Sequence, residues 1–163
     1  MKLLLVLASL LLSLNLFAQT GTQQPPQPPP KPTEDYSGLY FFLQDGESLQ
    51  LNIEDGNKVT GFIQRYGDTD TDRGLLLDHF FKDGKLDGKN LSFSTKTVHG
   101  VWYEFKGTVE RSDGKKPGDE AYYVLKGALI QSNIDAQQKT TTKSRDVALK
   151  AFPQNLDESP EKK

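Results

Sequence analysis

The chain has 163 residues, of which 35% are hydrophobic and 26% are charged, with 20 basic and 22 acidic side chains and no cysteine. This length fits one domain. The near balance of charge excludes a nucleic-acid-binding protein that works by neutralising phosphates, because such a protein needs a clear excess of basic residues. The lack of cysteine excludes disulfides, thiol nucleophiles and thiolate metal sites.

The first 18 residues predict a secretory signal peptide. Lys2 precedes an apolar stretch from Leu3 to Phe17, and the small residue Ala18 follows it. This is the order of the charged, apolar and cleavage regions of such a signal. The stretch is shorter than the ~20 apolar residues that a membrane-spanning helix needs. We therefore expect cleavage after Ala18, no transmembrane segment after cleavage, and an extracytoplasmic protein that is periplasmic or secreted.

Residues 19–34 predict a spacer rich in proline and glutamine. Six of the nine prolines lie between Pro25 and Pro32. Proline fixes φ and lacks an amide donor, so this stretch is expected to be extended or disordered. On composition a solvated spacer is favoured over a docking peptide.

Residues 35–131 show the pattern of β-strands. Apolar and polar side chains alternate, and a period of two predicts strands with one face on a core and one in water. Asp-Gly pairs, which form hairpin turns, separate the segments, and Asp83-Gly84 is expected to be one of them. The predicted strands are 38–43, 47–54, 58–66, 74–82, 89–97, 101–111 and 120–131.

The alternation also predicts how two hairpins pair. Strands 89–97 and 101–111 keep their core residues on one face if Phe93 opposes Phe105, with a three-residue loop at 98–100. In the next hairpin the preferred register sets Phe105 opposite Leu125. That register places a tyrosine ring over each mid-strand glycine and opposite charges across the strands.

Glycines inside the predicted strands indicate strong curvature; they are Gly61, Gly107 and Gly127. We therefore predict an all-β domain, a small curved antiparallel meander that closes as a barrel of seven or eight strands. A two-sheet β-sandwich is the alternative. The strand-and-turn pattern resembles that of lipocalin-like barrels, and residues 38–40, Gly-Leu-Tyr, are similar to their opening Gly-x-Trp, without the tryptophan. The resemblance implies this architecture alone.

Residues 132–163 predict a polar C-terminal tail with one short element near 144–152. Ser144 is a candidate cap for a short helix that Pro153 would end. A closing strand, indicated by alternating apolar residues from 147 to 151, is the alternative. The helix is slightly favoured.

No arrangement typical of an enzyme is visible. The two histidines are His79, on the inward side of its strand pattern, and His99, at a predicted hairpin tip. The sequence lacks a nucleophile elbow, a His-Glu-x-x-His helix and a phosphate-binding loop. Glu104 and Glu110 fall on a solvated strand face, which provides no apolar pocket to separate their pKa values. We expect a non-enzymatic protein without a cofactor.

Our leading hypothesis is an exported β-barrel module that binds a small apolar ligand or an envelope or secreted protein. Phe93, Tyr103, Phe105 and Tyr123 are the candidate ligand-binding residues, because they share the core-facing side of their strands. The same side chains can also fill a barrel of this size. The alternative is a structural envelope interaction domain with no ligand cavity.

Trp102 and Tyr122 are candidates for a surface interaction patch. Both fall on the outward side of their strand patterns, and a patch of exposed aromatic side chains is typical of a contact with a sugar, a peptide or a protein. A lysine stem laid over the indole is the alternative explanation.

Asp68, Asp70 and Asp72 are candidate metal ligands. Their spacing is similar to the Asp-x-Asp-x-Asp start of a calcium loop. Arg73 stands where such a loop needs glycine, and His79 stands where it needs a bidentate glutamate. A calcium-stabilised domain is therefore less favoured than a solvated turn.

Overall fold

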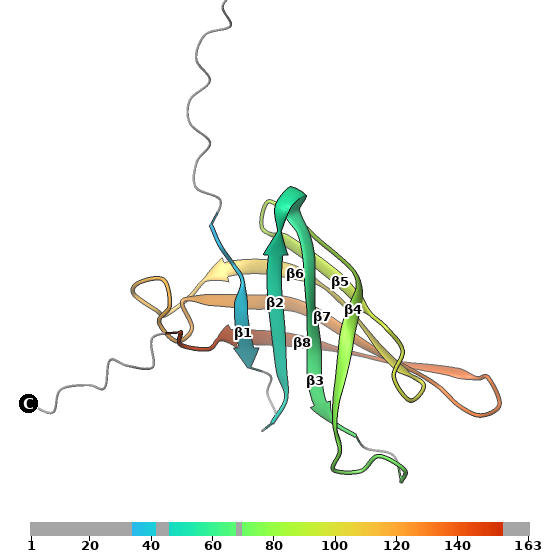
Figure 1. Cartoon of the computed structure of the whole chain (residues 1–163). Helices are drawn as coiled ribbons and strands as arrows, with labels where there is room; N and C mark the ends of the chain where they lie inside the picture. Colours follow the sequence, from blue (N-terminus) through green and yellow to red (C-terminus); the bar gives the residue numbers. More distant parts are fainter. Residues whose placement is uncertain (1–33, 42–45, 68–69, 155–163) are drawn as a thin grey trace, which may run out of the picture. The chain divides into compact units, whose positions relative to one another are not determined.

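The computed structural model describes residues 34–41, 46–67 and 70–154. This part of the chain forms eight strands and no α-helix (Figure 1). The strands are β1 (Gly38–Phe41), β2 (Ser48–Glu54), β3 (Lys58–Tyr66), β4 (Leu76–Asp87), β5 (Asn90–Thr95), β6 (Val101–Arg111), β7 (Tyr123–Ile134) and β8 (Thr140–Ala151). A 3-10 turn, η1 (Asp55–Asn57), joins β2 to β3. Within the described ranges, no helix has the length and apolarity required to cross a membrane.

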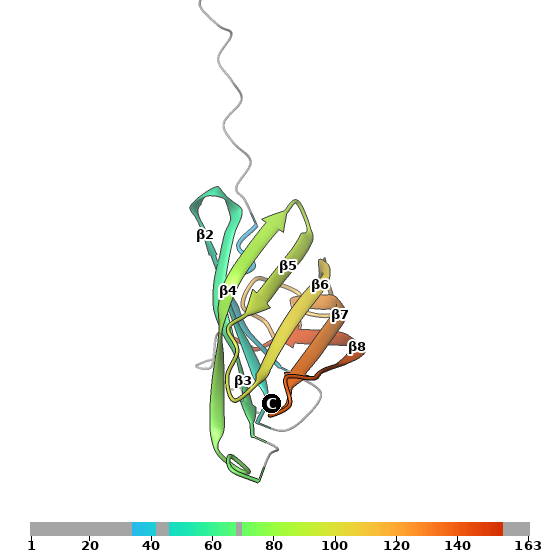
Figure 2. The same ribbon diagram turned by 90° about the vertical axis from the view of Figure 1, so that its right-hand side faces the viewer.

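Each strand pairs antiparallel with its neighbours in the chain, and the sheet closes on itself. The closing contact is between β1 and β8, where Tyr40 opposes Ala151 and Phe41 opposes Lys150. Figure 2 shows β4 to β8 side by side along one wall, with the β3–β4 hairpin reaching beyond the rest of the barrel. The predicted all-β barrel is confirmed, and the two-sheet sandwich is wrong.

β4 is longer than the sequence pattern indicated. The expected turn at Asp83-Gly84 is wrong, because both residues lie inside β4. The strand passes this point through irregularities on both sides: the register shifts between Lys58 and Phe62 on the β3 side and between Phe81 and Asp83 on the β5 side. Bulges of this kind bend a strand and increase its twist, so the glycine here serves curvature.

The C-terminal element is a strand. Residues 140–151 form β8, which pairs with β7 over eleven residues, from Val124 opposite Lys150 to Ile134 opposite Thr140. The favoured helix at 144–152 is therefore wrong, and the barrel continues beyond the expected boundary at Gln131. β8 is polar because most of its side chains are exposed, and only Val147 and Leu149 are buried.

One predicted register is confirmed and the other is wrong. Phe93 opposes Phe105 between β5 and β6, as expected. Between β6 and β7, however, Phe105 opposes Leu129 instead of Leu125. The loop before β7 is long, so it does not limit the register, and the backbones of the two strands lie in close contact where Gly107 meets Gly127.

The core lies inside the barrel and is contributed by every strand. Tyr40, Leu49, Leu125 and Leu149 are at most 1% exposed. Three phenylalanines stack in the interior: the ring centroids of Phe81 and Phe93 are 4.2 Å apart, and those of Phe93 and Phe105 are 5.2 Å apart.

The expected signal peptide at 1–18 and most of the expected spacer at 19–34 lie outside the described residues.

Candidate functional site

Polar side chains gather inside one end of the barrel. This is the end where β2, β4, β6 and β8 begin and where β3 finishes. The contributing residues are Glu47, Arg65, His79, Tyr103 and Arg145, and we call them the barrel-end cluster. In the sequence each shares the core-facing alternation of its strand, where an apolar residue would be expected.

Glu47 is the acidic residue of this cluster, and it lies between two basic ones. Its side chain is 9% exposed, and it lies between two arginines: Arg65 Nε is 3.8 Å from Oε1, and Arg145 Nη2 is 3.6 Å from Oε2. Both distances are too long for a good hydrogen bond, and Oε2 is buried without a hydrogen-bond partner. The two arginines therefore balance the negative charge of the carboxylate, while its Oε2 atom remains an unused hydrogen-bond acceptor.

Tyr103 connects this carboxylate to the opposite wall. An Arg65 Nη group donates a hydrogen bond to the Tyr103 hydroxyl, and the backbone N–H of Tyr103 donates to Thr95 Oγ1 at 2.9 Å. The Tyr103 ring also meets the His79 ring edge to face, with the centroids 5.0 Å apart. Contacts thus run from Glu47 through Arg65 and Tyr103 to His79.

His79 is a buried, uncharged histidine. It is 1% exposed, and burial, with a contribution from the nearby Arg65 charge, lowers the pKa of His79 to about 4. Its ring hydrogen-bonds the Val101 backbone, while Nδ1 is buried without a partner. Because a carbonyl accepts only from an N–H, the proton is on Nε2, and Nδ1 presents a lone pair.

The space beside His79 is small. The cavity that touches the ring has about 10 Å³ and is also lined by Arg65, Tyr103 and Val101. This is the size of one water-sized site. The space beside the histidine therefore admits no more than a single small polar group.

The acidic loop after β3 does not gather its carboxylates. Asp70 is exposed and pairs with Arg73 at 2.9 Å, whereas Asp72 is buried and contacts His99 Nδ1 at 3.0 Å. The structure does not bring these two candidate ligands together, because each carboxylate has its own partner; Asp68 lies outside the described residues. In the part of the chain that the structure describes, no group of three acidic or histidine side chains could hold a metal ion.

The aromatic candidates occupy two different environments. Phe93 and Phe105 are at most 5% exposed and pack on each other, and Tyr103 belongs to the barrel-end cluster. Tyr123 lies at the other end of the barrel, where its ring meets that of Tyr36 at 4.9 Å. The four residues therefore do not line a common site.

The structure does not bring the two candidates for a surface patch together. Trp102 is half-buried near the start of β6, whereas Tyr122 lies beside Arg111 at the end of that strand. The Arg111 guanidinium carbon is 3.2 Å from the Tyr122 ring centroid, and Tyr122 is only 9% exposed. Both aromatic residues fall on the outward side of the alternating sequence pattern, but most of the length of a strand separates them.

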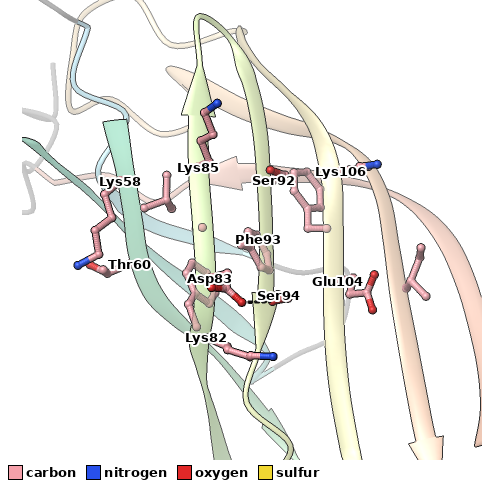
Figure 3. Close-up of a pocket in the computed structure, with 15 residues that line it drawn as sticks. Lys58, Thr60, Lys82, Asp83, Lys85, Ser92, Phe93, Ser94, Glu104 and Lys106 are labelled. Atoms are coloured by element: carbon pink, nitrogen blue, oxygen red, sulfur yellow. Dashed lines mark hydrogen bonds between the residues drawn. The ribbon is translucent and has the colours of Figure 1, made fainter. Parts of the chain in front are cut away.

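A groove of about 550 Å³ lies on the outer wall over β3 to β6 (Figure 3). Phe93 and Phe105 are among its lining residues, although they are buried. Its charged lining residues are Lys58, Lys82, Asp83, Lys85, Glu104 and Lys106.

The charges and unpartnered acceptors of the barrel-end cluster suit the binding of a polar group. Sequence reasoning placed His79 inside but missed Glu47, Arg65 and Arg145. The available signal was a charged residue at a core-facing position of a strand, such as Glu47 two residues before Leu49, because charges are almost never fully buried without a partner.

The fold is similar to that of avidin-like proteins. The rhizavidin–biotin complex matches with a TM-score of 0.55 at 10% identity, over 76% of this chain and 97% of that one. Apo short afifavidin matches with 0.51 at 14% identity, over 71% and 95%, and rhizavidin with 0.54 at 11% identity, over 77% and 89%. No protein-family model and no curated protein sequence matches the chain. At these identities the chain shares the avidin-like barrel fold, and the likeness extends to the fold alone.

Proposed function

We propose that this protein is a non-enzymatic binding module that holds a small polar ligand at the barrel-end cluster. The observation that carries the proposal is the presence of two buried acceptors without partners, Glu47 Oε2 and His79 Nδ1. A buried acceptor left unpaired costs about 1–3 kcal/mol. A ligand whose N–H or O–H group reaches one of these acceptors would recover part of that free energy, and this gives the site its affinity.

The chemistry of the acceptors defines the ligand class. A carboxylate and a neutral imidazole nitrogen both accept, so the ligand brings N–H or O–H donors. Arg65 and Arg145 donate, so a carbonyl or carboxylate on the same ligand is also matched. One similar structure holds biotin, whose ring urea combines two N–H donors with a carbonyl. A cyclic urea, amide or guanidine-like group has the required pattern.

Calorimetric titration with biotin and with 2-imidazolidinone, its cyclic urea part, tests the proposal. We expect binding by the wild type and an affinity about tenfold or more weaker in Glu47→Gln, because a hydrogen bond to a charged acceptor contributes about 1.5–3 kcal/mol. Glu104→Gln, on the outer wall, is the matched control and should bind like the wild type. The proposal fails if neither probe binds and native mass spectrometry of protein from its own host gives the bare chain mass.

A second candidate function is the structural interaction domain without an internal cavity. The packing of Phe81, Phe93 and Phe105 in the interior favours it. The outer wall also exposes a tilted aromatic pair, Phe62 and Phe80, with ring centroids 5.5 Å apart and Phe80 52% exposed. If this pair contacts a partner protein, Phe80→Ser abolishes recovery of that partner and leaves the melting temperature nearly unchanged.

Export is part of the proposal. The charged start, apolar stretch and small residue at positions 1–18 support a signal peptide cleaved after Ala18. The intact mass of the protein recovered from outside the cytoplasm tests this. A chain that begins at Gln19 supports export with cleavage, and a chain that still begins at Met1 contradicts it.

A further inference from the structure

A second cavity lies at the end of the barrel opposite the barrel-end cluster, and we call it the far-end pocket. Its walls are the start of β1 with the segment before it, the loop between β6 and β7, and the end of β8 with the residues after it (Figure 1). The pocket has about 200 Å³. Sites for drug-sized ligands have ~300–1,000 Å³, so this one suits a ligand of only a few heavy atoms.

Backbone hydrogen bonds join the walls of the pocket. The Phe152 N–H donates to the Leu39 carbonyl at 2.7 Å, which connects the residues after β8 to β1. The Gln154 N–H donates to the Gly118 carbonyl at 2.9 Å, which connects the same residues to the β6–β7 loop. The fold itself therefore fixes the shape of the pocket, as is usual for ligand sites.

Aromatic side chains form much of the lining. They are Tyr40, Tyr122, Tyr123 and Phe152. The rings of Tyr122 and Tyr123 have centroids 4.7 Å apart and lie at 77° to each other, so they meet like two sides of a corner. Aromatic ring faces attract cations, and the chain uses this property here, because the Arg111 guanidinium carbon is 3.2 Å from the Tyr122 ring centroid. Such rings favour a cationic ligand.

The charged side chains of the lining are acidic. Among the residues that the structure describes, Asp35 and Asp119 line the pocket, and no lysine, arginine or histidine does. The backbone N–H groups of Lys116 and Lys115 donate to Asp119 and lower the pKa of its carboxyl, so this carboxylate is charged at neutral pH. Arg111, Lys115 and Lys116 lie near the pocket but outside its lining. They weaken its negative potential without neutralising it from within.

The pKa of Tyr123 responds to the same negative potential. Burial, followed by the Glu34 carboxylate, raises this pKa above its ordinary value. Asp35 adds to the increase, and Arg111 acts in the opposite direction. The carboxylates near the phenol therefore outweigh the arginine, and such surroundings favour a cation.

We infer that the far-end pocket binds a small organic ammonium ion. Its charged head lies against the rings of Tyr122 and Tyr123, since aromatic cages recognise such groups. The carboxylates of Asp35 and Asp119 balance its charge. A calcium ion fits less well, because it needs about six or more oxygen ligands. None of the five residues of the barrel-end cluster lines this pocket within the described ranges, so the inference is independent of the ligand proposed for that cluster.

Calorimetric titration of the full chain with choline tests the inference. We expect saturable binding of choline and no measurable binding of 3,3-dimethylbutan-1-ol, which has the same shape but no charge. Tyr123→Leu should weaken choline binding about fivefold or more, because a contact between a cation and a ring is lost. Tyr123→Phe keeps the ring and should bind choline like the wild type.

Asp35→Asn and Asp119→Asn test the contribution of charge, and they keep the test decisive if Tyr123→Leu does not fold. Each retains a side-chain oxygen that can accept the backbone N–H groups bonded there. Each should weaken choline binding about threefold or more at low salt and less at high salt. Asp113→Asn is the matched control, since Asp113 lies in the same loop but outside the lining, and it should bind like the wild type.

Glu47→Gln separates the two ends of the barrel, because it should leave choline binding unchanged whether or not the barrel-end cluster binds its own ligand. A wild type that does not bind choline overturns the inference. So does equal binding of choline and the neutral alcohol, or wild-type affinity for choline in both Asp35→Asn and Asp119→Asn.

Discussion

Gly107 and Gly127 stand directly opposite each other in the β6–β7 ladder, and the two strands touch there through their backbones. A Cβ added at Gly107 would lie 2.2 Å from the Lys126 carbonyl oxygen and 2.6 Å from Cζ of the Phe105 ring. One added at Gly127 would lie 2.2 Å from the Lys106 carbonyl oxygen. The pair therefore lets the wall bend inward and lets Phe105 lie over the glycine to stack on Phe93.

Gly107→Ala should destabilise the barrel by more than about 2 kcal/mol, because the new methyl group collides with backbone and with a packed ring. Gly88→Ala is the matched control: Gly88 has φ +60° but nothing within 4 Å of an added Cβ. That variant should lose only about 1 kcal/mol from backbone strain. Urea unfolding of both variants measures the difference, and equal losses would show that the close approach is not a tight one.

Much of the fold could be predicted from local pattern alone. A period of two is a local property, so the alternation around Leu49 or Phe105 identified strands within a few residues of their bounds. The β6–β7 register could not be found this way, because every even shift keeps the same faces. The deciding contact, Gly107 against Gly127, is a close approach of two backbones, whereas the opposed charges chosen from the sequence involve exposed side chains of small energetic value.

The candidate site was harder to predict. A charged residue on a core-facing position, as at Glu47 or Arg65, signals a buried pair, but its partner comes from a distant strand and depends on how the barrel closes. The separation of the two aromatic candidates could not be predicted for a related reason. The alternation of the sequence indicates the face of the sheet on which Trp102 and Tyr122 lie. The distance between them depends on where along the barrel wall each residue is placed.

Thr95→Val should cost about 1–3 kcal/mol although it changes the shape of the core very little. The Thr95 hydroxyl accepts the backbone N–H of Tyr103 at 2.9 Å, and Thr95 is only 4% exposed. Valine removes the acceptor and leaves a buried donor unpaired. Thr95→Ser keeps the hydroxyl and should retain most of the stability in the same urea titration. If the serine variant is the less stable of the two, the methyl group and not the hydrogen bond is what matters here.

Arg65→Met should destabilise the barrel by about 2–4 kcal/mol, because it removes one of the two arginines that flank the buried Glu47 carboxylate and leaves Arg145 at 3.6 Å. Glu47→Gln removes the charge that needs Arg65, so the double variant Glu47→Gln/Arg65→Met should lose less than the sum of the single losses. A double-mutant cycle by chemical unfolding gives the coupling free energy. Additive losses would mean that the two side chains contribute independently.

His79 should make the barrel less stable in mild acid. Burial lowers the pKa of His79 from 6.5 to about 4, so between these values the unfolded chain binds a proton that the folded chain does not. Stability from this residue is complete above pH 6.5 and falls as the pH drops toward 4, by about 3 kcal/mol in total. Urea unfolding of the wild type and of His79→Gln across this range measures the contribution.

The glutamine amide can still donate to the Val101 carbonyl but does not titrate, so the variant should show a flatter dependence on pH. His99→Gln is the control for the other histidine and should keep the wild-type slope that His79 provides. Parallel pH profiles for the wild type and His79→Gln would mean that His79 titrates in the folded barrel as it does in the unfolded chain.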